Sequence, residues 1–262
     1  MCRNGRIVQS IGFNHTNVIG NVITAVDFFN TWAIDEIVIL DVSREKENQA
    51  MFFSVIQDLS RRCFVPLSVG GFVQSINDIR NLIKIGADKV IINTHAFKDP
   101  DFIHHSSEIF GNQCIVVSID VKKNDVKNYE VFVDRGRKPT GVSVIDWCVE
   151  SARRGAGEIY LTSIDNDGAR NGYDLDLIKL VTDAVDIPVI ASGGVGKWEH
   201  LEQGINTGNA QAVSAANIFH FTEHSTKKAK EYLEQTGLDV RKTDFYKIKK
   251  PRKPKYEFDY CV

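Results

Sequence analysis

Eight short apolar segments, each followed by a helical pattern, predict an α/β fold: a closed (β/α)8 TIM barrel with half-barrel internal duplication. The segments are rich in β-branched residues and lack strict alternation, which is typical of parallel strands buried on both faces. Eight such units in a chain of 262 residues match the size of a closed barrel. A doubly wound open sheet is the alternative, and the number of similar units favours closure.

The predicted strands follow one another at regular spacing. In chain order they are Arg6–Phe13, Asp35–Val42, Val65–Gly71, Asp88–Thr94, Cys114–Val121, Gly157–Asp165, Ile187–Gly194 and Ala212–Phe219. Amphipathic stretches such as 74–87 and 173–185 lie between them and predict the outer helices. Residues 122–141 alternate and carry turn residues, which indicates a hairpin over the mouth of the barrel.

Matches at a constant offset of 122 residues indicate that two half-barrels were joined by duplication. The segment DEIVIL at Asp35–Leu40 matches GEIYLT at Gly157–Thr162. The same offset relates four further pairs: Pro66 and Pro188, Gly71 and Gly193, Gly86 and Gly208, and Phe97 and Phe219. Five matches at one offset make chance a poor explanation.

The domain division places the barrel at 1–241 and a basic C-terminal tail at 242–262. Residues 241–255 hold eight Lys or Arg and one Asp. A solvated tail is the simpler interpretation; contact with an acidic partner, including nucleic acid, is the alternative. Aromatic residues such as Phe245 and Tyr246 could instead pack on the barrel.

Composition narrows the function classes. The net charge of −2 gives no field that would attract nucleic acid or a membrane surface. No apolar run is long enough to span a membrane, and the N-terminus does not resemble a signal peptide. The five scattered cysteines form no CxxC pair and fit a reducing, cytoplasmic location, with no metal site expected. No cofactor is expected.

Chemistry in such barrels lies at the C-terminal ends of the strands. Asp120 ends the fifth predicted strand and Asp167 follows the sixth, so two carboxylates could divide acid and base roles. The simpler alternative is that Asp167 caps its loop and Asp120 pairs with Lys122. The polar and small residues expected to bind substrate or phosphate at this rim are Asn93, Thr94, Gly168, Gly193, Gly194 and Asn217.

At the opposite rim, charged residues begin four of the strands: Arg6, Glu36, Lys89 and Glu158. Charge at the bottom of a buried barrel is unusual. Taken from the residues alone, a structural ring of salt bridges that closes the core is the favoured interpretation.

Four segments carry a resemblance to a known family: GADKVIINTHAF, FGNQCIVVSIDVKK, RGAGEIYLTSIDNDGARNGYD and IPVIASGGVGKWEH. They resemble the cyclase subunit of imidazole glycerol phosphate synthase, over about residues 6–241. The resemblance implies a half-barrel-duplicated (β/α)8 fold and a glutaminase partner at the barrel bottom. It implies that ammonia travels through the barrel, with the ring of charges as its gate and Asp88 at the partner interface.

The same resemblance implies departures at the top face. The family has an aspartate at the end of strand one, and in this sequence Gly12 stands at the corresponding position of the segment Ser10–Phe13. The lysine-bearing loop that follows is shorter, Phe72 replaces a glycine of a phosphate half-site, and Asn217 stands where serine is usual. These differences resemble the paralogous subunits of surface-polysaccharide synthesis, which work with a glutaminase and an ATP-dependent amidotransferase.

Three functions follow as hypotheses. The first is a subunit that channels ammonia for amidation of a nucleotide sugar in acetamidino-sugar or lipopolysaccharide synthesis. The second is a genuine imidazole glycerol phosphate cyclase, a lyase of histidine biosynthesis, in which another acid such as Asp41 serves. The third is a non-catalytic scaffold that activates the glutaminase.

Overall fold

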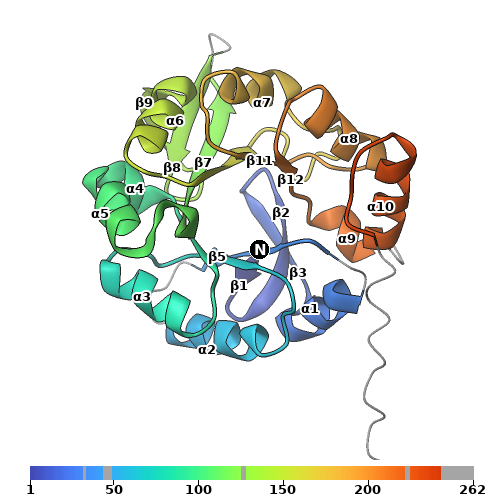
Figure 1. The fold of residues 1–262 in the computed structure, drawn as a ribbon, viewed down its shortest axis with the longest axis horizontal. Coiled ribbons are helices and arrows are strands. Elements are labelled where there is room, and N and C mark those ends of the chain that lie inside the picture. Colours follow the sequence, from blue (N-terminus) through green and yellow to red (C-terminus); the bar gives the residue numbers. More distant parts are fainter. Residues whose placement is uncertain (32–33, 44–48, 125–127, 222–224, 243–262) are drawn as a thin grey trace, which may run out of the picture.

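A computed structural model describes residues 1–31, 34–43, 49–124, 128–221 and 225–242. Figure 1 shows a ring of helices around a curled sheet, seen along the barrel axis. The fold belongs to the (β/α)8 class, as predicted. No helix in the described ranges is long and apolar enough to cross a membrane. Most of the predicted basic tail lies outside the described residues.

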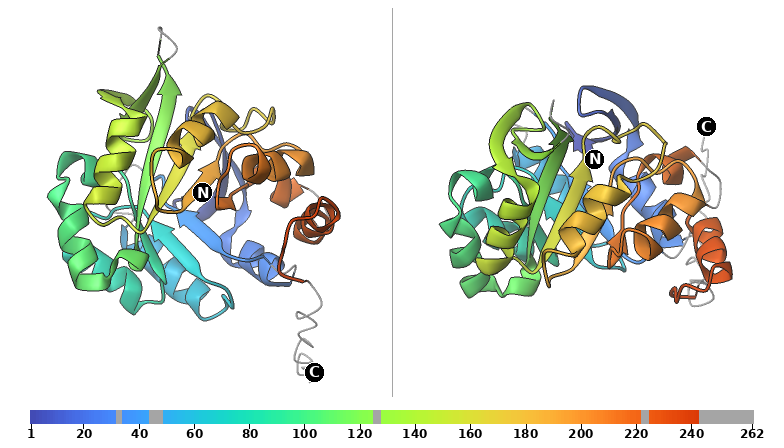
Figure 2. Two further views of the ribbon diagram at one scale, coloured as in Figure 1. Left: turned by 45° about the horizontal axis from the view of Figure 1, so that its top comes forward. Right: turned by 90° about the horizontal axis from the view of Figure 1, so that it is seen from above.

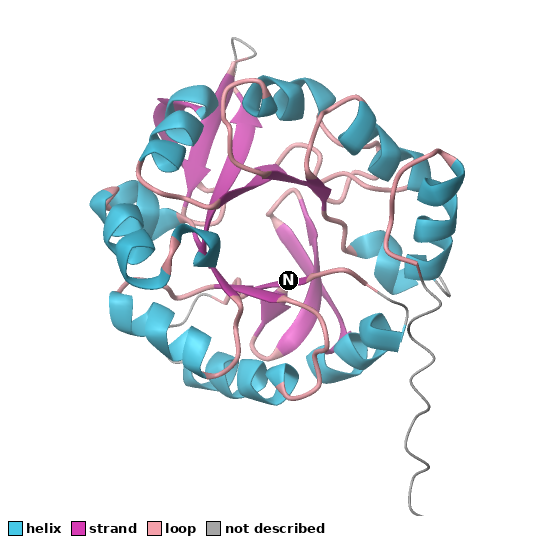
Figure 3. Ribbon diagram, viewed as in Figure 1, coloured by secondary structure: helices cyan, strands magenta, loops and turns pink. Residues whose placement is uncertain are grey.

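Seven parallel strands form the barrel wall, in the order β4-β5-β6-β7-β10-β11-β12. Figure 3 shows them as a curved inner layer with the helices outside. Their bounds are β4 Ile37–Leu40, β5 Leu67–Gly70, β6 Lys89–Ile92, β7 Ile115–Lys123, β10 Glu158–Ser163, β11 Val189–Ser192 and β12 Ala212–Val213.

The helices cover the outside of this wall and supply one side of the main core. They are α1 Val22–Thr31, α2 Gln49–Ser60, α3 Ile76–Lys84, α4 Thr94–Lys98, α5 Asp101–Phe110, α6 Val144–Arg153, α7 Leu175–Thr182, α8 Trp198–Asn206, α9 Asn217–Phe221 and α10 Ser225–Gln235, with a 3-10 turn at Asn112–Cys114. Helix α3 illustrates why these segments are helical. Its N-cap Ser75 accepts a hydrogen bond from the Asp78 amide, and Ile79 and Leu82 are buried on one face.

The first predicted barrel strand is wrong. Strand β2 (Arg6–Ile11) pairs antiparallel with β1 (Cys2–Arg3) and β3 (His15–Asn21) in a separate three-stranded sheet. Its β-branched residues suit any sheet, and the sequence pattern did not reveal which partner they meet. A parallel bridge between Cys2 and Asp41 joins this sheet to the barrel, and the Val42 amide donates to the Cys2 carbonyl at 2.8 Å.

Of two other predicted segments, the last strand is shorter than predicted and the hairpin is confirmed. The last predicted strand is short, because β12 covers only Ala212–Val213 and α9 begins at Asn217. The predicted hairpin is confirmed: β8 (Tyr129–Val133) pairs antiparallel with β7 and with β9 (Lys138–Ser143). The left view of Figure 2 shows this hairpin rising from one side of the barrel.

The duplication is visible in the backbone. Gly71 has a φ of +125°, and a Cβ there would lie 2.7 Å from the Cβ of Asp41 at the end of β4. Gly193 has a φ of +95°, and its Cβ would lie 2.7 Å from the carbonyl oxygen of Ser163 at the end of β10. The corresponding residues of the two contacts are 122 positions apart: Gly71 and Gly193, and Asp41 and Ser163. Glycine is therefore required twice by the same close approach of neighbouring strand ends.

Candidate active site at the C-terminal ends of the parallel strands

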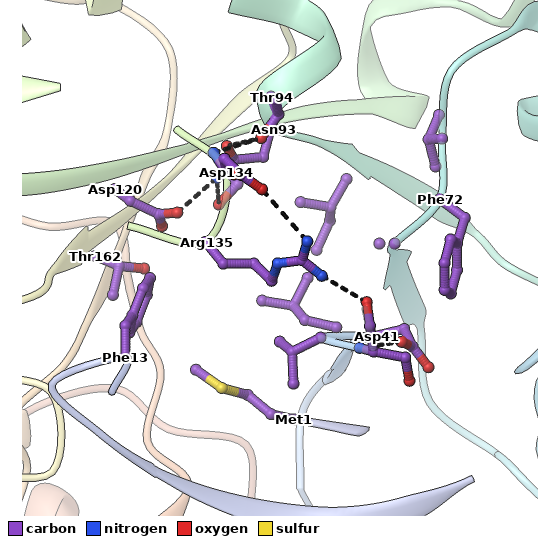
Figure 4. A pocket seen from close by; sticks show the side chains of 18 of the residues that line it. Met1, Phe13, Asp41, Phe72, Asn93, Thr94, Asp120, Asp134, Arg135 and Thr162 are labelled. Atoms are coloured by element: carbon purple, nitrogen blue, oxygen red, sulfur yellow. Dashed lines mark hydrogen bonds and ion pairs between the residues drawn. The ribbon is translucent and has the colours of Figure 1, made fainter. Parts of the chain in front are cut away.

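A cavity of about 480 Å³ opens at the C-terminal ends of the parallel strands, where chemistry was predicted. Figure 4 shows side chains from several strands and from the β8–β9 turn converging on it. Of the predicted site residues, Asn93, Thr94 and Asp120 line the cavity, together with Asp41 and Phe72.

Asp120 is the best-defined titratable group in this cavity. It lies near the end of β7 and is 6% exposed, and its Oδ2 accepts a hydrogen bond of 2.8 Å from Asn93 Nδ2. Burial raises its pKa to about 7; the Asn93 hydrogen bond acts in the opposite direction, and the charge of Asp167 adds to the rise. Near neutral pH this carboxyl can therefore both donate and accept a proton. The predicted alternative pairing with Lys122 is not the contact observed.

Asn93 and Thr94 connect Asp120 to the hairpin above it. Asn93 Nδ2 also donates to Ser118 Oγ at 3.3 Å, and Thr94 Oγ1 donates to Asn93 Oδ1 at 3.4 Å. Thr94 Oγ1 in turn accepts the amide of Asp134 at 2.9 Å, in the turn between β8 and β9. The position of Asp120 is thus set by a chain of hydrogen bonds that begins at the hairpin.

Asp167 occupies a different environment. Its Oδ2 accepts the Ser10 hydroxyl at 2.6 Å and the Phe13 amide at 3.3 Å, and its carbonyl accepts the Gly12 amide at 2.9 Å. Burial raises its pKa, and the hydrogen bond from Ser10 opposes the rise. Asp167 therefore fastens the β2–β3 sheet to the loop after β10, and it is not among the residues that line the cavity.

Gly12 lies in the turn between β2 and β3, with a φ of +56°, and not at the end of a barrel strand. A comparison with a strand-one aspartate is therefore misplaced, and the identity of Gly12 says nothing about a lost catalytic acid. Met1 and Asp41 approach the cavity at the place where Cys2 bridges to the barrel. This correction removes the main argument against proton-transfer chemistry at this rim.

The predicted phosphate glycines make close backbone contacts. A Cβ at Gly168 would lie 2.7 Å from the Ser10 carbonyl oxygen, and one at Gly194 would overlap the Gly172 carbonyl oxygen at 2.0 Å. Gly193 and Gly194 both have positive φ at the end of β11. Asn217 begins α9, and its Oδ1 is buried without a hydrogen-bond partner in the described part of the chain.

Phe72 obstructs the cavity less than its size suggests. Its φ is +59°, and its ring packs at 6.4 Å, centroid to centroid, from the ring of Phe52 on α2. In Figure 4 the ring lies at the edge of the cavity, away from Asp120.

Two features of the cavity were missed by sequence reasoning. Tyr160 on β10 has its hydroxyl within 3.0 Å of both Ser192 Oγ and Ser214 Oγ, and burial raises its pKa. Arg135 extends across the cavity from the β8–β9 turn (Figure 4). The period of two along a strand could have indicated Tyr160, because it lies two residues after the predicted ring residue Glu158 and so on the same strand face.

Three of the four predicted ring residues meet at the opposite rim. Lys89 Nζ lies 2.7 Å from Glu158 Oε1 and 3.2 Å from Glu36 Oε2. Burial opposes the charged form of Lys89, but Glu158 and Glu36 raise its pKa. Arg6 does not join them; it lies in β2, paired with Arg3 and Asn21. Nearby, Asp88 Oδ2 accepts the Leu67 amide at 2.8 Å, a contact that orders the start of β5.

An apolar layer separates the charged rim from the cavity. On β6, Lys89, Ile91 and Asn93 alternate along one face and so point into the barrel; Glu158 and Tyr160 repeat this order on β10. The buried residues of this small core cluster are Ile91, Val116, Tyr160 and Ile190. The barrel interior is therefore charged at one end, apolar in the middle and polar at the other end.

Comparisons with known proteins agree with this arrangement. Residues 2–225 match the family model described as histidine biosynthesis protein. A protein of Vibrio vulnificus (strain YJ016), named "Putative imidazole glycerol phosphate synthase subunit hisF2", is 46% identical over 236 residues, covering 90% of this chain and 86% of the relative. The chain therefore belongs to the histidine biosynthesis protein family, as a relative of the cyclase (HisF) subunit of imidazole glycerol phosphate synthase.

Proposed function

We propose that this chain is the synthase subunit of a glutamine amidotransferase and adds ammonia to a phosphorylated small molecule in the cavity around Asp120. The observation that carries the proposal is Asp120 itself. It is a buried carboxyl at the end of a parallel strand, its pKa is about 7, and it faces a cavity of substrate size. A structural carboxyl would gain stability from a full ion pair, whereas Asp120 has the amide of Asn93 as its partner.

Ammonia from a separate glutaminase would enter at the opposite rim. The Lys89, Glu36 and Glu158 cluster lies at the N-terminal ends of the strands, with Asp88 beside it. The apolar layer above the cluster admits a neutral molecule far more readily than an ion, because burying an unpaired charge is costly. This order supports transfer of NH₃, not NH₄⁺, towards the cavity. Members of the family of the cyclase subunit work with such a glutaminase.

For the acceptor, we propose a nucleotide sugar, which would be amidated together with an ATP-dependent amidotransferase. The support comes from two departures from the pattern of the histidine cyclase at its phosphate half-sites. Phe72 places a bulky side chain where glycine is expected, and Asn217 stands where serine is usual, with its Oδ1 buried and without a hydrogen-bond partner among the described residues. Asn217 is not among the residues that line the cavity, so Phe72 is the departure that bears on the ligand there.

Imidazole glycerol phosphate synthesis is the second candidate, and a specific observation favours it. Asp41 lines the same cavity, burial raises its pKa, and its Oδ2 is buried with no partner within the described ranges. With Asp120 it could form the pair of acids that ring closure needs. The name of the Vibrio relative also points to this reaction.

A coupled glutaminase assay separates these functions. The chain is mixed with its cognate glutaminase and glutamine, and glutamate release is followed with the histidine-pathway intermediate or with a panel of nucleotide sugars. Stimulation by a nucleotide sugar alone supports the amidation proposal, and stimulation with consumption of the histidine intermediate supports the second candidate. If Asp120→Asn keeps full product formation in either assay, the chain acts as a scaffold and the proposed chemistry is wrong.

A further inference from the structure

The turn between β8 and β9 has left-handed backbone at three consecutive residues. Asp134, Arg135 and Gly136 have φ values of +53°, +60° and +71°. Left-handed backbone costs a non-glycine residue about 1–2 kcal/mol, and it persists where the surroundings enforce it. Here the Thr94 hydroxyl accepts the Asp134 amide, and Arg137 Nη2 donates to Asp134 Oδ2 at 2.8 Å.

The left-handed turn directs Arg135 across the mouth of the cavity, as Figure 4 shows. Arg135 Nη1 donates to the Ser43 carbonyl at 2.7 Å, and Nη2 lies 3.3 Å from Asp134 Oδ1. Its Nε is buried and has no hydrogen-bond partner within the described chain. A guanidinium has five N–H donors, so several remain available on a side chain that is 35% exposed.

The charges around the cavity favour an anionic ligand. The basic side chains that line it are Arg3, Lys98, Arg135 and Arg137, and the acidic ones are Asp41, Asp120 and Asp134. Asp134 is shared between Arg135 and Arg137. An anion on the free edge of the Arg135 fork would satisfy the orphaned Nε, and leaving such a buried donor unpaired is costly.

We propose that Arg135 is a specificity-determining residue that binds an anionic group of the substrate, a phosphate or a carboxylate, in the part of the cavity next to Ser43. The proposal rests on the proposed function in that both use the same cavity. It explains how this part of the cavity can bind an anion although Phe72 occupies a position where a glycine is expected: a side-chain fork supplies the donors. It also gives the left-handed turn a role, since Arg135 extends from this turn across the cavity.

Binding of simple anions tests the assignment without any turnover. Inorganic pyrophosphate, inorganic phosphate and malonate are titrated by calorimetry at low ionic strength into the full chain and three variants. Arg135→Gln removes the charge and the fork, Arg135→Lys keeps the charge alone, and Lys138→Gln is the matched control on β9, exposed and outside the cavity. The phosphate and malonate titrations distinguish the two kinds of anion.

We expect Arg135→Gln to weaken anion binding by about 10–100-fold, the range for a hydrogen-bonded charge. Arg135→Lys should bind with intermediate affinity, because an ammonium cannot reproduce the bidentate geometry. Lys138→Gln should bind as the unaltered chain does. Equal affinity of Arg135→Gln and the unaltered chain, or no binding of any of the three anions at millimolar concentration, overturns the proposal and leaves Arg135 as a clamp on Ser43.

A second measurement remains informative if a variant folds poorly. The Nε–Hε resonance of Arg135 is assigned in the unaltered chain by its loss in Arg135→Lys or, if that variant folds poorly, in Arg135→Gln, and it is then followed during anion titration of the unaltered chain. A saturable shift supports direct contact, and an unmoved resonance contradicts it. Failure here is distinguishable from failure of the proposed function. Loss of turnover in Asp120→Asn with normal anion binding in Arg135→Gln would sink this inference alone.

Discussion

Replacing Asp120 with Asn should make the protein more stable and less active at the same time. The side chain keeps its shape and can still accept the hydrogen bond from Asn93, but it can no longer ionise. The folded protein holds the Asp120 proton up to about pH 7, whereas the unfolded chain releases it near the ordinary value of 3.8. The free energy of unfolding of the unaltered chain therefore falls as pH rises through this window.

The size of the effect follows from the difference in pKa. About three pKa units correspond to about 4 kcal/mol, which is the destabilisation that a charged Asp120 imposes above neutral pH. Asp120→Asn should recover this amount at pH 8 and little at pH 4, where Asp120 is protonated in the folded protein and about half protonated in the unfolded chain. For a domain of this size the gain corresponds to a rise in Tm on the order of 10 °C.

Urea unfolding at pH 4, 6 and 8 measures the stability, and the coupled glutaminase assay measures the product. Product formation should fall by ~10²–10⁴-fold, the range for losing a proton-transfer group. Asp183→Asn is the control, since Asp183 is the C-cap residue of the outer helix α7 and forms an exposed ion pair with Lys179. If the unfolding free energies of Asp120→Asn and the unaltered chain differ equally at pH 4 and pH 8, Asp120 is not a buried group with a raised pKa.

Three further changes test other parts of the structure. Lys89→Met should lower the free energy of unfolding by about 1–3 kcal/mol in urea titration, because it leaves Glu158 half-buried without its cation; an unchanged midpoint would contradict this. Gly71→Ala should cost more than Gly141→Ala, because both have positive φ but only Gly71 has a neighbour within 2.7 Å; equal costs in thermal melts would show that the close approach is absent. Ser10→Ala removes a hydrogen bond of 2.6 Å to the partly buried carboxylate of Asp167 and should cost about 1–3 kcal/mol; faster amide exchange in β2, with the barrel strands unaffected, is the expected signature.

Apolar runs located the strands of the barrel wall well, because burial on both faces leaves a continuous pattern that depends on local sequence alone. The same reasoning failed at Arg6–Phe13, where an equally apolar run pairs antiparallel within its own small sheet. The deciding contacts there are long-range: Cys2 bridges to Asp41, and Ser10 bonds to Asp167. Such contacts leave no periodic signal in the sequence. Placing Arg6–Phe13 in the barrel therefore led to both wrong predictions, Gly12 at the end of a barrel strand and Arg6 in the ring of charges.

The site was predicted in part for a similar reason. Strand ends of a parallel sheet meet at one rim, so the approach of Asp120 and Asn93 could be anticipated. The surroundings of the predicted carboxylates could not be anticipated. Asp167 bonds to β2 and does not line the cavity, because its partner Ser10 lies more than 150 residues away in the sequence. Arg135 lay inside a predicted hairpin, but its direction depends on a left-handed turn that the sequence of this turn did not make evident.

The repeated contact of Gly71 with Asp41 and of Gly193 with Ser163 has a consequence for how a ligand lies in the barrel. One backbone frame occurs twice, but the side chains placed on it differ. The first copy offers Asp41, Asn93 and Thr94, whereas the positions 122 residues later hold Ser163, Ala215 and Ala216. The backbone of the rim thus has pseudo-twofold symmetry, whereas its side chains do not. The backbone shape would accept a ligand with two unlike ends in either orientation. The different side chains of the two halves would favour only one of these orientations.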